Sequence, residues 1–190
     1  MESTHTYTTF IGHDLLATGP VATAVLAAKT RMDSGENAPI LIFDDHTGKQ
    51  VDFDYEGTPD QVIARLPHHP VVGADYTAPR TGPGRPRLGV VSREVSLLPR
   101  HWEWLEGQPQ GASAALRRLI DDARKKEPEK DRARKVREAA GTFMWAMAGN
   151  FPNFEEASRA LYAGDVGRFD AWIREWPKDV QGYLRRLLAG

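Results

Sequence analysis

The stretch from Gly84 to Lys126 constrains the fold of this 190-residue chain more than any other part of the sequence. It begins with a basic arm rich in proline and glycine, which leads into a short extended run from Val90 to Leu98. Pro99 follows at the position where a helix would start, because proline suits the first residue of a helix. After a break at residues 107–111, apolar residues recur with helical spacing over residues 113–125. The pattern therefore predicts a strand, a helix, a turn and a second helix.

This order of elements resembles the ribbon-helix-helix fold of DNA-binding proteins. The Gly111-Ala112-Ser113 turn is similar to the Gly-x-Ser sequence that opens the second helix in that family. The resemblance implies a homodimer, because two chains pair their strands into an antiparallel ribbon that lies in the major groove of double-stranded DNA. The whole chain also resembles a bacterial family of conserved proteins of unknown function, and that second resemblance implies no activity.

The predicted ribbon and its helices supply two sets of candidate site residues. The residues expected to face bases or phosphates are Arg85, Arg87, Ser92, Arg93, Glu94, Ser96, Gly111 and Ser113. The residues expected to form the dimer core are Val95, Leu97, Trp102, Leu116, Leu119 and Ile120. Successive side chains of a strand point to opposite faces, so one face of the ribbon closes the dimer while the other reads the DNA.

The register of the ribbon departs from the pattern that the resemblance implies. The family usually places its last apolar residue directly before the proline and turns basic or amide residues outward. Here the doubled Leu97-Leu98 shifts the alternation or implies a β-bulge. Glu94 can accept a hydrogen bond from cytosine but repels phosphate, and Arg93 reaches the base-reading face only in the shifted register.

Two features beside the ribbon have more than one interpretation. The backbone N–H groups of residues 111–114 are suited to bind a phosphate at the positive end of the second helix, or else Ser113 is a plain N-cap. The Gly84-Arg85-Pro86-Arg87 sequence resembles the Gly-Arg-Pro core of arms that enter the minor groove of A·T-rich DNA. Pro83 stands where such arms have a further arginine, and the alternative is a mobile basic linker.

The net charge of −1 conceals a change of sign along the chain. Residues 1–78 carry 4 Lys/Arg against 11 Asp/Glu, residues 79–138 carry 15 against 9, and residues 139–190 carry 6 against 6. The balances are therefore −7, +6 and 0. A basic centre beside an acidic region favours contact with a polyanion, although charge runs also occur on faces that are only solvated.

The residues before the central segment predict a small domain over residues 1–72, with the order β-α-β-β-α. The expected elements are strands at Tyr7–Ile11, Pro39–Phe43 and Gln50–Tyr55 and helices at about residues 20–32 and 58–66. β-branched and aromatic residues favour the first strand. A capping box at residues 58–61, with proline at the first helical position, opens the second helix.

The rest of the chain predicts a linker, the central module and a helical C-terminal part, so the fold class is α+β. Residues 73–89 are the linker, because apolar periodicity stops there while proline and glycine accumulate. Residues 90–126 are the ribbon-helix-helix-like module. Residues 127–190 form a helical region that resembles a small bundle, with helices expected at 154–163, 165–175 and 178–189.

Composition and motifs limit the functions that the chain can have. The sequence has no cysteine, which excludes disulfides and thiolate sites, and no apolar run near the ~20 residues that span a bilayer. The first ten residues lack the layout of a signal peptide, so a cytoplasmic protein without a membrane partner is expected. No nucleotide-binding or hydrolase motif is present, so neither enzymatic activity nor a metal or cofactor is expected.

We therefore predict a homodimeric, DNA-binding regulator of transcription. The alternative is an adaptor that binds other proteins and has no nucleic acid or enzymatic function. The acidic N-terminal part and the aromatic-rich C-terminal helices motivate this alternative, because short helices can present a groove to a partner.

Overall fold

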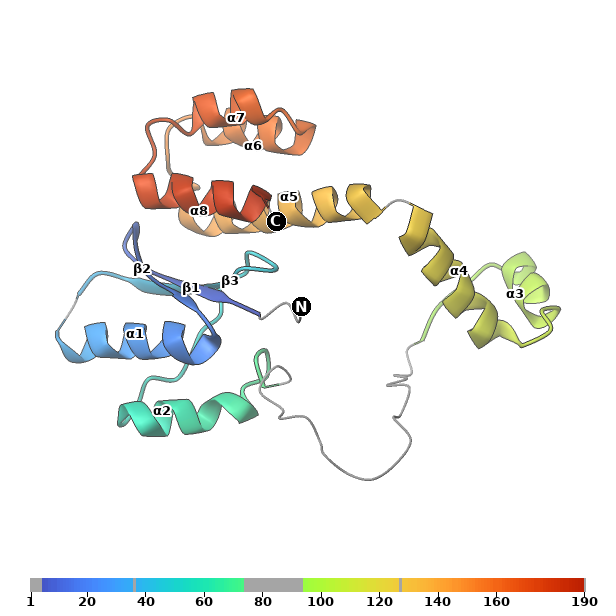
Figure 1. The fold of residues 1–190 in the computed structure, drawn as a ribbon, viewed down its shortest axis with the longest axis horizontal. Coiled ribbons are helices and arrows are strands. Elements are labelled where there is room, and N and C mark those ends of the chain that lie inside the picture. Colours follow the sequence, from blue (N-terminus) through green and yellow to red (C-terminus); the bar gives the residue numbers. More distant parts are fainter. Residues whose placement is uncertain (1–4, 36, 74–93, 127, 190) are drawn as a thin grey trace. The chain divides into compact units, whose positions relative to one another are not determined.

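The computed structural model describes residues 5–35, 37–73, 94–126 and 128–189. The chain divides into two compact units. The first unit combines residues 1–78 with residues 132–190, and the second comprises residues 79–131. The predicted α+β class is confirmed, because the first unit contains a three-stranded antiparallel sheet and helices occur in both units (Figure 1).

The sheet of the first unit has the order β2-β1-β3. Its strands are β1 (Tyr7–Ile11), β2 (Asp14–Gly19) and β3 (Ile40–Asp44), and β1 pairs antiparallel with both neighbours. A tight turn joins β1 to β2 at Gly12, whose φ of 55° lies in the left-handed region that favours glycine. The sheet is therefore a hairpin with one further strand added along β1.

The helices cover both faces of this sheet (Figure 1). On one side lie α1 (Val21–Asp33), α2 (Pro59–Arg65) and the short 3-10 helix Leu66–His68. On the other side lie α5 (Pro128–Met147), α6 (Phe154–Ala163), α7 (Val166–Trp172) and α8 (Lys178–Ala189). Both faces of the strands are consequently buried, so that Tyr7 to Phe10 of β1 are all covered, including the polar Thr8 and Thr9.

Alternating side chains divide the core into two clusters. Tyr7 and Ile42 belong to the cluster on the α1 side, whereas Phe10 and Phe43 belong to the cluster formed with the C-terminal helices. In the second cluster the ring of Phe143 lies 4.8 Å from that of Phe43 and 5.6 Å from that of Phe10, measured between centroids. Such edge and tilted contacts between rings are favourable beyond the area that they bury.

The domain layout differs from the sequence prediction in two respects. Residues 1–72 and 127–190 were expected in separate domains, but most of both segments belongs to the first unit, because the Phe10 and Phe43 face needs the C-terminal helices to cover it. The order of the first elements is β-β-α-β-α rather than β-α-β-β-α, since β2 precedes α1. Within residues 50–55, only Gln50 forms a bridge, to Phe43.

The linker predicted at residues 73–89 lies outside the described residues except for Gly73. In the part of the chain that the structure describes, every helix is too short or too polar to cross a membrane. The capping box predicted at residues 58–61 is confirmed, with the Thr58 hydroxyl accepting from the Gln61 backbone and the Gln61 side chain accepting from the Thr58 backbone.

Candidate nucleic-acid interface

The described part of the second unit is built on a pair of helices. Helix α3 (Pro99–Glu106) starts with proline at its first turn, and α4 (Ala112–Lys126) follows a short turn. In that turn Gly111 has a φ of 76°, and its N–H donates to the Gln108 carbonyl at 3.0 Å. The two helices and the break between them therefore agree with the prediction from the sequence.

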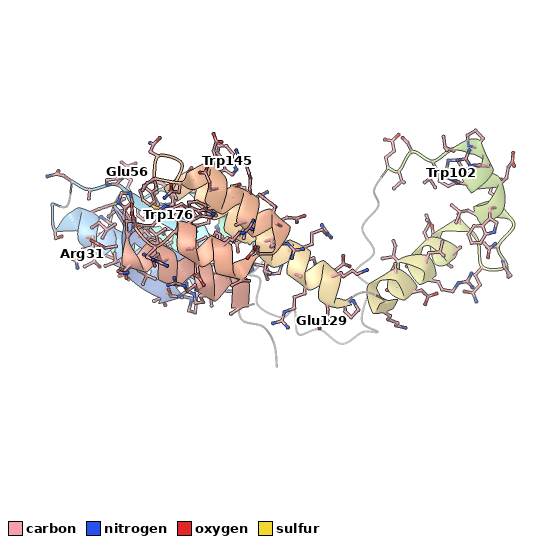
Figure 2. All side chains as sticks on the ribbon, turned by 90° about the horizontal axis from the view of Figure 1, so that it is seen from above. Arg31, Glu56, Trp102, Glu129, Trp145 and Trp176 are labelled. Atoms are coloured by element: carbon pink, nitrogen blue, oxygen red, sulfur yellow. The ribbon has the colours of Figure 1, made fainter. Side chains whose placement is uncertain are left out.

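Little of the apolar surface of this helix pair is buried within the chain. Leu105 of α3 and Ala115 of α4 are buried, each with 3% of its surface exposed. Ile120 is 56% exposed and Trp104 is 50% exposed. Among the described residues of the unit, the other large apolar residues that are exposed are Val95, Leu98, Trp102 and Leu119, and Figure 2 shows Trp102 on α3.

The residues predicted to form a dimer core are thus mostly uncovered. Val95, Trp102, Leu119 and Ile120 are exposed, and Leu97 and Leu116 are half-buried. We name the six exposed residues Val95, Leu98, Trp102, Trp104, Leu119 and Ile120 the apolar set of the second unit. Exposed apolar residues mark an interaction surface where they form one contiguous patch.

The ribbon itself is described only in part. Residues 94–98 adopt no strand, and residues 90–93 lie outside the described residues. Val95 and Leu98 are exposed while Leu97 is half-buried, so neither register of the predicted ribbon is selected. A strand that pairs with a second chain has no partner within one chain, and the ribbon stays a prediction.

The candidate DNA-facing residues fall into two groups. Glu94, Ser96, Gly111 and Ser113 are exposed, whereas Arg85, Arg87, Ser92 and Arg93 lie outside the described residues. The carbonyl of Gly111 accepts from the N–H of Ala115 at 3.1 Å, which places Ser113 as the second residue of α4 rather than its N-cap. The first turn of α4 contains no acidic residue, so nothing there opposes an anion at the positive end of the helix.

Arg117 was not among the DNA-facing residues predicted from the sequence. Arg117 is exposed and lies four residues after Ser113, so both fall on one face of α4. Its neighbour Arg118 donates to the Gln108 side chain at 3.3 Å and thereby ties α4 to the turn. The four-residue spacing between Ser113 and Arg117 was the signal available in the sequence. The acidic residues Asp121 and Asp122, one helical turn later, obscure it.

A second polar assembly lies in the first unit, around the turn that follows β3. The Asp45 carboxylate accepts hydrogen bonds from the hydroxyls of Thr6 and Thr8, each at 2.7 Å, and from that of Tyr183 at 2.9 Å. Arg186 lies 3.7 Å from the same carboxylate and donates to Thr8 at 2.6 Å. This network joins β1 and the turn after β3 to α8.

Each group of this network has a partner, which indicates a structural role. Burial and the neighbouring Asp45 carboxylate raise the pKa of Tyr183 above its usual range, so the phenol is a neutral donor. The spacing of 138 residues between Asp45 and Tyr183 explains why no local pattern in the sequence reveals the contact.

Asp44 stabilises the turn after β3 by accepting hydrogen bonds from residues within and beside it. Its carboxylate accepts from His5 Nε2 at 2.7 Å, from the His46 backbone N–H at 2.8 Å and from the Thr47 hydroxyl at 2.9 Å. Burial raises the pKa of Asp44, but these hydrogen bonds and the charge of His5 lower it, and the net pKa lies below the usual 3.8. Among the described residues, no group of three or more His, Asp and Glu side chains is arranged to hold a metal ion.

The fold thus defines an α+β protein with a covered sheet and a separate helix pair. The model of a family described as an uncharacterized protein conserved in bacteria (DUF2239) matches residues 6–188, and the chain belongs to this family. No curated protein and no solved structure matches the chain.

Proposed function

We propose that residues 90–126 bind double-stranded DNA as a ribbon-helix-helix-like module, aided by the basic arm that precedes them, and that the protein is a homodimeric regulator of transcription. The observation that carries the proposal is the exposed apolar set of the second unit, on a helix pair with the predicted spacing. In the ribbon-helix-helix arrangement a second copy covers such a surface, because one chain cannot bury a two-helix core alone.

Three features beside the apolar set support contact with DNA. The segment from residue 79 to 138 has a charge balance of +6. The start of α4 offers backbone N–H groups, the Ser113 hydroxyl and, one turn later, the exposed Arg117. Arg85 and Arg87 precede the module in the sequence, where they can reach phosphates or a narrow minor groove.

The first test is a salt titration of binding to duplex DNA of random sequence. If the basic centre contacts phosphates, the logarithm of the association constant falls linearly and steeply with the logarithm of the salt concentration. Binding that does not depend on salt, or no binding at low salt, contradicts the proposal.

The second test separates the basic arm from the dimer core. Replacing Arg85 and Arg87 by alanine should weaken binding to all sequences and lower the salt slope by about one to two units, with the dimer intact. Arg31→Ala combined with Lys49→Ala removes two exposed charges from the first unit and should leave the slope unchanged. Leu97→Asp should abolish the dimer, because it places a charge in the apolar seam.

The opposite pattern favours the second candidate function, an adaptor that binds other proteins. Exposed aromatic and apolar side chains on the C-terminal helices support that candidate, namely Trp145, Tyr162, Val166 and Trp172. A pull-down from a bacterial lysate should then recover a protein in stoichiometric amount, and Trp145→Ala should reduce its recovery. Recovery of nucleic acid without such a protein counts against the adaptor.

A further inference from the structure

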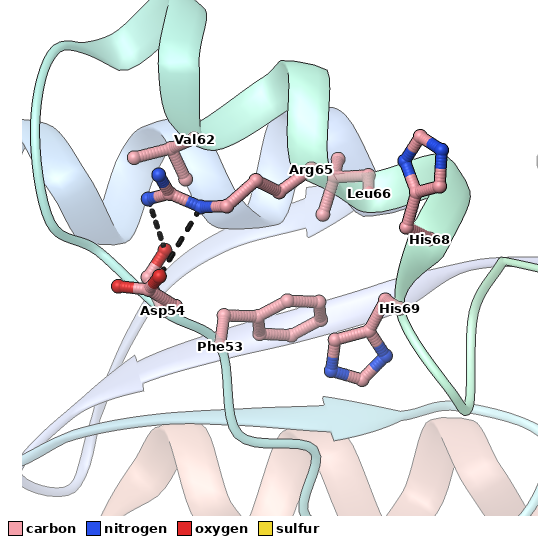
Figure 3. Close-up of a pocket in the computed structure, with 7 residues that line it drawn as sticks. All are labelled: Phe53, Asp54, Val62, Arg65, Leu66, His68 and His69. Atoms are coloured by element: carbon pink, nitrogen blue, oxygen red, sulfur yellow. Dashed lines mark hydrogen bonds and ion pairs between the residues drawn. The ribbon is translucent and has the colours of Figure 1, made fainter.

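The first unit contains a pocket of about 240 Å³ that neither proposed function uses. It lies between α2, the 3-10 helix and the segment that follows β3 (Figure 3). The lining residues are Phe53, Asp54, Val62, Arg65, Leu66, His68 and His69. Pockets for drug-sized ligands measure roughly 300–1,000 Å³, and a cavity of about 150 Å³ holds benzene. The volume therefore suits a single ring.

One side of the pocket is a platform of two stacked rings. The rings of Phe53 and His69 lie 4.8 Å apart between centroids, with an interplanar angle of 29°. His69 is fixed in place because its Nδ1 accepts from the backbone N–H groups of Val71 and Val72 at 3.2 and 3.3 Å. Its Nε2 therefore carries the hydrogen and donates to the Asp52 carbonyl at 2.9 Å. The platform is thus held rigidly before any ligand arrives.

The opposite side combines apolar side chains with the guanidinium of Arg65. Val62 and Leu66 are buried, and the side chain of Arg65 extends along this side towards Asp54 (Figure 3). Arg65 Nη2 donates to the carbonyls of Asp54 and Glu56 at 3.0 and 2.5 Å. Arg65 Nε is buried without a hydrogen bond, and its ion-pair distance to Asp54 Oδ2 is 3.3 Å.

We propose that this pocket binds a single planar aromatic ring. A planar ring would contact the Phe53–His69 platform by stacking or edge contacts and the guanidinium through its π face. A saturated ring of equal size fills the same volume but gains neither of these contacts. The ring belongs either to a free small molecule or to an aromatic side chain of a peptide, since the recognition chemistry is the same.

The experiment compares phenol with cyclohexanol, which have the same size and hydroxyl group but differ in aromaticity. Each is titrated into the full-length, ¹⁵N-labelled protein while amide chemical shifts are recorded. Phenol should cause saturable shifts confined to the amides that line or adjoin the pocket, namely those of residues 52–54, 62, 65, 66, 68, 69, 71 and 72, with an affinity several-fold above that of cyclohexanol. Equal affinities, or no saturable shift with phenol up to its solubility limit, overturn the proposal.

Variants locate the site within the fold. Phe53→Leu keeps an apolar side chain but removes the ring, and should weaken phenol binding by about 2- to 10-fold, the usual contribution of one aromatic pair. Trp145→Leu removes an exposed ring from the same unit and should leave binding unchanged. Loss of binding in Trp145→Leu alone overturns the proposal. The comparison of phenol with cyclohexanol needs no variant and therefore decides the matter even if Phe53→Leu does not fold.

A third titration with N-acetyltyrosinamide distinguishes the two sources of the ring. This compound carries the phenol on a peptide-like backbone. If it shifts the same amides as phenol, the pocket accepts a side chain of a peptide. If only phenol does so, the ligand is a free small molecule, because a flanking backbone is excluded.

Discussion

The two units differ in how completely they cover their apolar side chains. In the first unit Phe10, Phe43 and Phe143 are fully buried between the sheet and the C-terminal helices. In the second unit Leu105 and Ala115 are buried, whereas the apolar set remains exposed. Burial of apolar surface contributes about 25 cal/mol per Å². The first unit gains that contribution within the chain, whereas the apolar set of the second unit does not.

The polar groups show the same difference. In the first unit the Asp45 carboxylate is surrounded by Thr6, Thr8, Tyr183 and Arg186, so its charge is compensated inside the fold. In the second unit Arg117 and Ser113 are exposed at the start of α4. Polar groups with inward partners hold a fold together, whereas outward-facing ones are available to a ligand. The predictions below test this contrast in order of expected effect.

The largest effect is expected from the aromatic core of the first unit. Phe143→Ala should lower the free energy of unfolding by about 3–5 kcal/mol, because it removes a buried ring and leaves a cavity among Phe10, Phe43 and Tyr183. Urea denaturation followed by circular dichroism measures this loss. The second unit should keep its own helices, so the loss should be confined to the transition of the first unit.

The control for this prediction lies two residues further along the same helix. Trp145 is 68% exposed and touches Phe154 in an edge contact at 4.9 Å. Trp145→Ala should therefore cost about 1 kcal/mol. Equal losses in the two variants would show that the distinction between covered and uncovered side chains does not describe this unit.

The second prediction concerns the apolar set. Burying an isoleucine is worth about 1.5–3 kcal/mol, and in a symmetric dimer each residue counts twice. Because Ile120 is 56% exposed in the single chain, Ile120→Ser should raise the dissociation constant of the dimer about 20- to 300-fold, while the helix content of the monomer hardly changes. Sedimentation equilibrium and circular dichroism measure the two quantities. Asp122→Ser changes an exposed polar residue of the same helix and should leave the dimer intact.

A wild-type protein that sediments as a monomer at micromolar concentration removes the dimer altogether. The apolar set would then need another partner, and the adaptor would become the leading function. A dimer that tolerates Ile120→Ser but dissociates with Trp145→Ala would place the interface on the first unit instead.

The sequence was sufficient to predict elements with strong local signals. The capping box at residues 58–61, the proline at the start of α3 and the apolar spacing of α4 each act within a few residues. Strand β2 escaped prediction, because its six residues carry little β-branched character and its turn depends on Gly12 alone. The alternating run at 50–55 was mistaken for a strand, since its pairing with β3 ends at the bond from the Val51 N–H to the Ile42 carbonyl, while Val51, Phe53 and Tyr55 pack towards the α1 side.

The long-range contacts could not be predicted in this way. Phe10 and Phe43 give no indication of the helix that covers them, which lies about a hundred residues further along the chain. The eight DNA-facing residues were chosen by resemblance and charge, and four of them lie outside the described residues. The polar network around Asp45 was not predicted for the same reason, because Asp45 and Tyr183 are 138 residues apart.

The third prediction tests the hydrogen-bond network around Asp45. Tyr183→Phe removes the hydroxyl that donates to Asp45 at 2.9 Å and keeps the ring in the core. Loss of one donor to a mostly buried carboxylate should cost about 1–2 kcal/mol of unfolding free energy. Tyr162→Phe, which alters a tyrosine that is 55% exposed, should cost less than about 0.5 kcal/mol. If both variants lose the same amount, the network around Asp45 contributes nothing particular to stability.

The smallest effect is expected from Asp44, and it depends on pH. The pKa of Asp44 in the folded protein lies below its value of 3.8 in the unfolded chain. The group therefore adds stability that is complete above the unfolded value and is lost as the pH falls through the lower, folded value. Asp44→Asn should cost about 1 kcal/mol near pH 7, because neutral hydrogen bonds replace charge-assisted ones. Below pH 4 the difference between variant and wild type should shrink.

Unfolding free energies measured in urea between pH 7 and pH 3 give this difference directly. Glu175→Gln, an exposed change in the same unit, is the matched control and should follow the wild-type curve throughout. If the difference in unfolding free energy between Asp44→Asn and the wild type stays constant down to pH 3, the charge of the Asp44 carboxylate does not contribute to stability. The turn after β3 would then be held by its backbone and Gly48, where φ is 67° and a side chain would collide with the Ala139 carbonyl oxygen.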